Sequence, residues 1–379
     1  MTGVRSAAVA VLVAMLSGCG FAAQTAAQPK GPIKIAALLS LTGVYSVVGI
    51  PQQSAAQVAV DDINAHGGIN GRKVELTVFD DQSKQEQGVA LAQQIASDPG
   101  FLGVVGLVNA TMGPPESTAL NNAAVPTVAV FGDATRSTDP GKYVFKEAPT
   151  FDTYALGMMG FIQSKLKFTK VGVLYETNVY GTGILNTFKA QGSQFSIQVV
   201  DAESIQPNAV DDTAQLSRIV ASGAQVIVTA NSTNLSVPIL NWAALGYPLP
   251  LIGQIGYSNP LQIKPSEEPG KKITAIVAQL TGDDPLPRQK AFVQLYEKAR
   301  NETPQYPQAA MWDAVQMLAK GLKTDASSRE TVRASIEKIK DFQGAGGVYT
   351  FSAQSHQGFD PSGIVMIRYQ GNGHYSLYS

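Results

Sequence analysis

Short apolar runs alternate with longer amphipathic stretches beyond about residue 30, and this alternation constrains the fold more than any other feature of the sequence. The apolar run Ile33–Leu39 predicts a strand. Gln52–Ala65 then predicts a helix, because Ala56, Val60 and Ile63 fall on one face. Strands that alternate with helices imply parallel sheets covered on both faces by right-handed crossovers. We therefore expect an α/β fold.

The alternation forms two blocks. The first predicts further strands at 74–79, 102–108 and 125–130 and helices at 86–97 and 114–122; a strand at 143–147 follows it and leads into a crossover. The second predicts strands at 171–175, 198–201, 226–229 and from 250, and helices at 181–191, 212–221 and 237–245. Three helices are then predicted at 288–300, 308–321 and 328–340, before short strands at 347–351 and 364–369. The chain is therefore expected to form two doubly wound parallel-sheet lobes and to cross between them more than once. The length of 379 residues agrees, since single cores stop growing at about 250–300.

The N-terminus has the features of an export signal. Arg5 precedes the apolar run Ala7–Leu16, which ends in Leu16-Ser17-Gly18-Cys19. This run is about half the length that a membrane-spanning helix needs. The segment resembles a bacterial lipoprotein signal, which implies a signal peptide over 1–18, a lipidated Cys19 and a tether over 19–31. The alternative is that Cys19 is a small residue in a signal peptide that is cleaved elsewhere.

Several classes of function are disfavoured by composition. The 28 basic and 29 acidic residues give a net charge of −1 without a basic stripe, so nucleic acid is not an expected partner. One cysteine excludes an internal disulfide or a two-cysteine motif. The three histidines, His66, His356 and His374, are scattered, so neither a metal nor a cofactor is expected.

Catalytic motifs are also missing from the sequence. It contains no Gly-x-Ser-x-Gly elbow and no Walker A loop. Gly181-Thr182-Gly183 lies where a dinucleotide loop would be, but Asn186 replaces the third glycine, so we interpret it as a helix start. No nucleophile–base pair can be assembled from the motifs, and we expect a protein that is not an enzyme.

A ligand is expected beyond the carboxyl ends of the parallel strands. Loops facing one another from two lobes would form a cleft, and helix N-termini there could hold a carboxylate. The loops that follow the predicted strands carry the candidate contacts Tyr45, Ala110, Thr111, Phe131, Asp133, Tyr180, Ser232 and Tyr257.

The chain resembles the branched-chain amino acid (leucine/isoleucine/valine) binding branch of the type I periplasmic binding proteins. The most specific stretch is residues 59–74, AVDDINAHGGINGRKV, followed by Asp80-Asp81-Gln82-Ser83. Tyr180-Gly181 and the aromatic-rich helix within 306–321 match as well. The resemblance implies two lobes joined by three crossovers, near Pro149, Gln279 and Phe351. It assigns residues 32–149 and 280–350 to the N-terminal lobe and 150–279 and 351–379 to the C-terminal lobe.

The resemblance carries over to the binding residues unevenly. Tyr180 falls on the family's cleft tyrosine, although a partly buried aromatic that caps the helix would look the same. Ala110 replaces a serine that often binds the ligand carboxylate, and Thr111 lies beside it. The family's acidic residue for an α-ammonium group is absent near Ile255.

Other candidates have two interpretations each. Asp133 either takes over the cation-binding role or caps the turn that follows it. Phe131, Tyr45 and Tyr257 either add stacking surface for an apolar or aromatic ligand or pack in the core.

These observations predict a monomeric, exported and lipid-anchored solute-binding protein of an ABC importer. Its partners would be a small-molecule ligand, the membrane through its lipid and the membrane permease. The ligand would be an amino acid or a related small carboxylate, amide or aromatic compound. The alternative is a ligand-sensing module that acts on a separate receptor or regulator.

Overall fold

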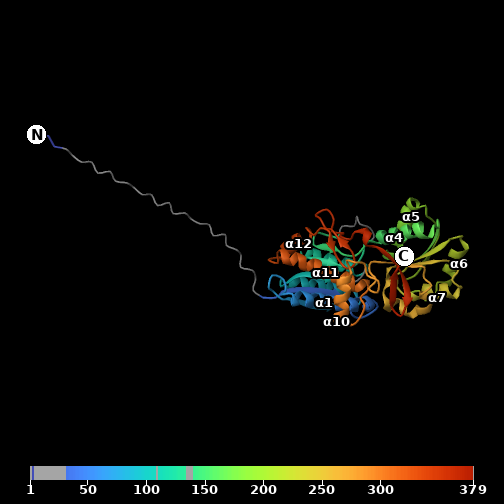
Figure 1. The fold of residues 1–379 in the computed structure, drawn as a ribbon, viewed down its shortest axis with the longest axis horizontal. Coiled ribbons are helices and arrows are strands. Elements are labelled where there is room, and N and C mark those ends of the chain that lie inside the picture. The colour runs from blue at the N-terminus through green and yellow to red at the C-terminus, as the bar shows by residue number, and fades with distance from the viewer. Residues whose placement is uncertain (1, 4–30, 108–109, 134–139, 379) are drawn as a thin grey trace. The chain divides into compact units, whose positions relative to one another are not determined.

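The computed structural model describes residues 2–3, 31–107, 110–133 and 140–378. Most of the predicted signal peptide, Cys19 and most of the predicted tether lie outside the described residues. The fold described below is that of the unit Gly31–Ser379 (Figure 1).

The first sheet is parallel throughout and has the strand order β2-β1-β3-β4-β5. Its strands are β1 Ile33–Leu39, β2 Val74–Asp80, β3 Phe101–Gly106, β4 Thr127–Ala129 and β5 Val144–Lys146. The helices that follow the first three strands are α1 Ser46–Ala65, α2 Gln85–Ser97 and α3 Gly113–Asn122. This sequence of elements is the one that the first block of alternating segments predicts.

Both faces of the first sheet are buried. Ile35 and Ala37 of β1 belong to one core with α1 and α11, whereas Ala36 and Leu38 belong to another with α2 and α3. Side chains alternate along a strand, so these two sets point to opposite faces. The later helices α10 Lys290–Arg300, α11 Tyr306–Thr324 and α12 Arg329–Ile336 return to this lobe and gather beside α1 (Figure 1).

The second sheet has the order β14-β13-β10-β9-β8-β6-β7. Its strands are β6 Lys170–Glu176, β7 Gln198–Ile205, β8 Val226–Ala230, β9 Leu251–Gly253, β10 Ala275–Ala278, β13 Val365–Gly371 and β14 His374–Leu377. Its strands pair in parallel except β13, which is antiparallel to β10 on one side and to β14 on the other. The helices of this lobe are α4 Phe151–Phe161, α5 Val179–Gln191, α6 Thr213–Ala221 and α7 Ser236–Ala244. The expected fold of two parallel-sheet lobes is confirmed.

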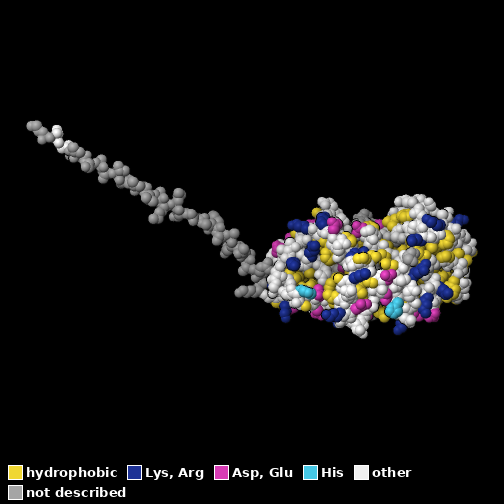
Figure 2. Space-filling view, in the orientation of Figure 1, with side chains coloured by type: hydrophobic (Ala, Val, Ile, Leu, Met, Phe, Trp, Pro, Cys, Tyr) yellow, Lys and Arg dark blue, Asp and Glu magenta, His cyan; other side chains and the backbone are white. Residues whose placement is uncertain are grey.

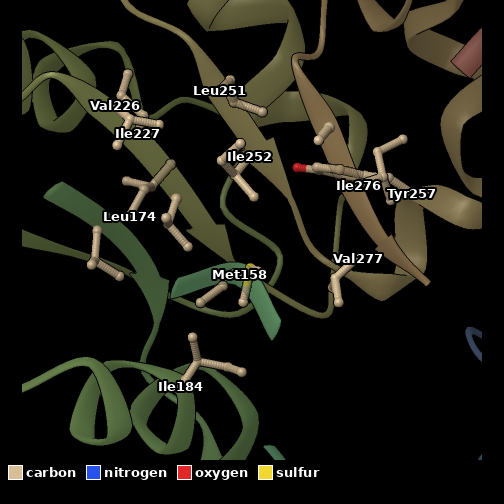
Figure 3. Close-up of a cluster of buried hydrophobic side chains, with 14 of the residues drawn as sticks. Met158, Leu174, Ile184, Val226, Ile227, Leu251, Ile252, Tyr257, Ile276 and Val277 are labelled. Atoms are coloured by element: carbon tan, nitrogen blue, oxygen red, sulfur yellow. The ribbon is translucent and has the colours of Figure 1, made fainter. Parts of the chain in front are cut away.

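The core of the second lobe fills the space between the sheet and its helices. Figure 3 shows Met158 of α4 and Ile184 of α5 beside Leu174 and Ile252 of the strands. All four side chains are fully buried. Each such burial contributes about 1.5–3 kcal/mol to the stability of the second lobe.

The chain passes between the sheets three times. It leaves β5 of the first sheet for α4, and it leaves β10 of the second sheet for α10. Phe351 and Phe359 are buried in the core of the first lobe, and the chain rejoins the second sheet at β13. We therefore propose that the third connection lies at 360–364 and not near Phe351.

The surface of this unit carries both signs of charge. Figure 2 shows basic and acidic side chains interspersed over the visible face. None of the helices in the described part of the chain combines the length and the hydropathy that a membrane span requires.

Candidate functional site

A cavity of about 160 Å³ is lined by residues of both lobes, at the carboxyl ends of the strands. An apolar cavity of about this volume admits a molecule the size of benzene. The residues that line it after β3, β4 and β5 are Ala110, Thr111, Val130, Phe131, Gly132, Glu147 and Ala148. Those that line it after β6, β8, β9 and β10 are Asn178, Val179, Tyr180, Ser232, Leu235, Gln254, Ile255, Gly256, Gln262 and Gln279. Ligands of open α/β sheets bind at this edge.

Helix α1 closes one side of the cavity through Tyr45, Val48 and Gln52. The first turn of this helix lies directly against the end of β1. A Cβ on Gly49 would lie 1.9 Å from the carbonyl oxygen of Ser40, so only glycine permits this approach. The Tyr45 N–H donates to Ser83 Oγ at 3.1 Å, and burial raises the pKa of the Tyr45 hydroxyl, which also bonds Thr111.

Most of the candidates expected from the sequence line the cavity. They are Tyr45, Ala110, Thr111, Phe131, Tyr180 and Ser232. Their role as ligand contacts stays a prediction.

Tyr180 lies in the first turn of α5, near residues of several other elements. Its ring makes a T-shaped contact with Phe151 at a centroid distance of 5.1 Å. Its hydroxyl donates to Gln254 Oε1 at 3.4 Å. Burial, and then the neighbouring Tyr306 and Tyr257, raise the pKa of this hydroxyl, so it remains a neutral donor at physiological pH.

The loops around Tyr180 are held by the buried carboxylate of Glu176. Its Oε2 accepts from the N–H and the hydroxyl of Ser232, at 2.7 and 2.8 Å, and from Asn178 Nδ2 at 2.5 Å. Asn178 in turn caps α5 by accepting from the N–H of Gly181 at 2.9 Å. Because the Ser232 hydroxyl already donates to Glu176, a ligand could only donate to it.

Asp133 is expected as a ligand contact but is not among the residues that line the cavity. Asp133 Oδ2 accepts from Gln357 Nε2 at 2.6 Å and lies 3.4 Å from Lys146 Nζ. Lys146 is fully buried, and this desolvation lowers its pKa to about 7 although Asp133 opposes the shift. Its ammonium group also lies 2.7 Å from the ring centroid of Phe131. A buried cation needs a partner, and Asp133 is the carboxylate partner of Lys146 within the protein.

Tyr257 is also not among the residues that line the cavity. It is fully buried in the core of the second lobe, and its hydroxyl donates to Asn231 Oδ1 at 3.4 Å. A Cβ on Gly253 would lie 2.4 Å from its ring, which shows how closely the ring packs against β9. The core-packing alternative is therefore correct for this residue.

The sequence analysis missed Glu147, which brings a carboxyl group to the cavity. Glu147 is fully buried and follows β5 directly. Its Oε1 lies 2.5 Å from the hydroxyl oxygen of Tyr349, which also lies 2.9 Å from Asp313 Oδ2. Burial, followed by the nearby Asp313, raises the pKa of Glu147 well above its usual value. An acidic residue at the end of the predicted strand 143–147 was the signal that could have identified it.

Four side chains that line the cavity carry a buried polar atom without a hydrogen-bond partner among the described residues. These atoms are Gln52 Oε1, Glu147 Oε2, Gln262 Oε1 and Gln279 Nε2. Such atoms are rare in folded proteins, because leaving them unpaired costs about 1–3 kcal/mol each. Their concentration at one cavity indicates a polar binding site.

Among the residues that the structure describes, acidic, histidine and cysteine side chains do not gather into a metal site. Over the described ranges, no group of three or more of them could hold a metal ion. The described cavity-lining residues also include no lysine, arginine or histidine.

Two α/β lobes with a polar and aromatic cavity at the ends of their strands define a class of ligand-binding proteins. A model of the periplasmic binding protein family matches residues 32–373. The chain belongs to this family, and the resemblance noted from the sequence is confirmed.

Individual relatives agree with this assignment. The Leu/Ile/Val-binding protein homolog 3 of Brucella melitensis is 32% identical over 216 residues, which cover 56% of this chain and 58% of that protein. The match thus spans little more than half of its length. The leucine-, isoleucine-, valine-, threonine- and alanine-binding protein of Pseudomonas aeruginosa is 25% identical over 315 residues, 82% of this chain and 83% of that protein.

Solved structures share the fold. A type 1 periplasmic binding protein from Bordetella pertussis superposes with a TM-score of 0.80 and 24% identity, over 92% of this chain and 99% of its own.

Proposed function

We propose that this protein is the extracytoplasmic solute-binding component of an ABC importer. It captures a small molecule in the cavity between its lobes and delivers it, chemically unchanged, to a membrane permease. The observation that carries the proposal is the cavity itself, which the strand ends of both sheets line. The names of the Brucella and Pseudomonas relatives support an amino acid or a compound related to one.

The arrangement of the chain suggests how binding would be signalled. Three connections join the two sheets, so the lobes can move relative to each other by changing a few backbone angles. A ligand that contacts Tyr180 of one lobe and Glu147 of the other favours the arrangement in which both contacts are made. The permease would then recognise the closed form.

We also propose that the mature protein is exported and anchored through a lipid on Cys19. The proposal rests on Leu16-Ser17-Gly18-Cys19 after a short apolar run. Two or more acyl chains anchor a protein stably, whereas one chain binds only marginally. Cys19→Ala should therefore move the protein from the membrane fraction to the soluble fraction of its host. Retention of the variant in the membrane fraction after a high-salt wash would refute the lipid anchor.

Loss of uptake in the host tests the transport role. The lipid-free domain 31–379 is first screened by thermal unfolding against amino acids, amides, amines, aromatic acids and polyols. A ligand at one hundred times its Kd stabilises the protein by about 2.7 kcal/mol, which such a screen detects. Deleting the gene should then abolish high-affinity uptake of the radiolabelled hit, and the wild-type gene should restore it. Unchanged uptake in the deletion strain would reject the transport role.

A further inference from the structure

The carboxyl group of Glu147 is the feature of the cavity that no motif in the sequence explains. The side chain is fully buried, and Oε2 has no hydrogen-bond partner among the described residues. Its neighbour Lys146 does not neutralise it, because successive strand side chains point to opposite faces and Lys146 pairs with Asp133. The cavity therefore contains an acidic group without a basic partner.

The position of the carboxyl proton follows from the hydrogen bonds around Tyr349. Its single hydroxyl lies 2.5 Å from Glu147 Oε1 and 2.9 Å from Asp313 Oδ2, yet it can donate to only one of them. Asp313 also accepts from the N–H groups of Ala345 and Gly346, both at 2.7 Å, and these donors stabilise its anion. The Tyr349 hydroxyl therefore donates to Asp313, and Glu147 carries a proton that it donates to Tyr349.

The remaining groups near Glu147 agree with this assignment. Burial, and then the neighbouring Tyr180 and Tyr306, raise the pKa of Tyr154, whose hydroxyl donates to Gln279 Oε1 at 3.3 Å and not to Glu147. Burial raises the pKa of Asp313 to about 7, and burial, followed by the nearby Asp313, raises the pKa of Glu147 well above its usual value. The hydrogen bonds around Tyr349 and Asp313 therefore leave unliganded Glu147 protonated, with Oε2 as a free acceptor.

A cation is the ligand group that this environment favours most. Its charge would convert the carboxyl into a carboxylate and form a buried ion pair, with hydrogen bonds at Oε2. The rings of Phe151, Tyr154, Tyr180 and Tyr306 line the same cavity and present faces that attract cations and apolar groups. A ligand carboxylate would meet no lysine, arginine or histidine among the described lining residues.

We propose that Glu147 binds the ammonium group of the solute as an ion pair, so that the solute is a small amine with an apolar or aromatic body and needs no carboxylate. The inference rests on the proposed solute-binding function and narrows its ligand class. Glu147 would fill the role of the acidic residue that is absent near Ile255, from the opposite lobe.

Two matched sets of compounds test the proposal by calorimetry on the 31–379 domain. The first comprises leucine, 3-methylbutylamine without the carboxylate and 4-methylpentanoate without the amine. The second comprises phenylalanine, 2-phenylethylamine and 3-phenylpropanoate. At least one of the two amines should bind, and the acid of its set should bind about 100-fold more weakly or not at all. Equal or tighter binding of an acid, or no binding of either amine, would overturn the proposal.

Two variants then test the role of Glu147 in binding the amine. Glu147→Gln keeps the size of the side chain and the neutral state of the unliganded protein, so its unfolding temperature should stay close to that of wild type. It should bind the amine about 100-fold more weakly. Glu116→Gln alters another buried carboxyl group that is not among the cavity-lining residues, and should bind as wild type does. Unchanged amine affinity in a folded Glu147→Gln variant would also overturn the proposal.

Proton release gives a readout that a purely structural role would not affect. Repeating the titration in buffers of different ionisation enthalpy measures the protons exchanged on binding. Wild type should release roughly one proton per amine bound, because Glu147 ionises, and Glu147→Gln should release none. If the wild-type protein binds the amine without releasing a proton, the proposed ion pair is wrong.

The compound sets test the ligand class, and the gene deletion tests the transport function, so the two hypotheses can fail separately. If the amines fail but another compound from the thermal screen depends on this gene for uptake, the ligand class is wrong and the transport function stands. If uptake of every bound compound is independent of the gene, the transport function is wrong.

Discussion

The Tyr180→Ala variant is expected to bind its solute about 100-fold more weakly than wild type, equivalent to about 3 kcal/mol. The variant loses an aromatic wall of the cavity, its contact with Phe151 and the hydroxyl that reaches Gln254. Large aromatic side chains at the centre of a desolvated site carry much of the binding energy. Isothermal titration of the compound identified by the thermal screen measures the effect.

Two further variants show which part of Tyr180 is responsible. Tyr180→Phe keeps the ring and should lose tenfold or less, about 1.4 kcal/mol at most, because it removes one long hydrogen bond. Tyr247→Ala changes a tyrosine that is 40% exposed and is not among the cavity-lining residues, and it should retain wild-type affinity. Wild-type affinity in a folded Tyr180→Ala variant would remove this residue from the site.

The second prediction with a large effect is that Glu116 makes the free energy of unfolding depend on pH. This residue of α3 is fully buried, and neither carboxyl oxygen has a hydrogen-bond partner among the described residues. Burial, and then the nearby Asp81, raise the pKa of Glu116 to about 8 from a usual value of 4.5. In the unfolded chain the proton leaves near pH 4.5, whereas in the folded protein it stays until about pH 8. The stability that the proton provides is therefore lost as pH rises through this window, on the order of 5 kcal/mol.

Glu116→Gln should remove most of this pH dependence. The neutral amide has the size of the protonated carboxyl group, so the variant should match wild type at pH 5 and exceed its free energy of unfolding by a few kcal/mol above pH 8. Urea unfolding, followed by circular dichroism across this range, measures both. Glu86→Gln, an exposed position on α2, serves as the control and should keep the wild-type slope. Parallel pH profiles for wild type and Glu116→Gln would show that Glu116 is ionised in the folded protein.

The fold was largely predictable because its strands are short, apolar and regularly separated by amphipathic helices. Most of the predicted strands and helices are found within a few residues of their expected bounds. Helix α4 was missed, since residues on most of its faces are buried and the sequence has no apolar stripe to reveal it. Strand β10 was also missed, because it consists of four apolar residues and shows no alternation of apolar and polar side chains.

The site was less predictable, because strand ends can be located from a pattern while side-chain directions cannot. Asp133 and Glu147 both follow strands of the first sheet. The buried Lys146 pairs with Asp133, whereas Glu147 lines the cavity. This difference between the two acidic residues depends on packing across several elements. The sequence left Tyr257 with two interpretations for the same reason, and the segment after β9 turns its ring into the core. By contrast, Tyr180 could be placed at the cavity because it lies in the segment that follows a predicted strand and because the resemblance assigns it to the family's cleft tyrosine.

The most direct test of the central claim is a crystal structure of the 31–379 domain with the tightest-binding compound from the thermal screen. The account predicts density for the compound inside the cavity, in contact with Tyr180 of one lobe and Glu147 of the other. Density at any other place on the protein, with this cavity filled only by solvent, would contradict it.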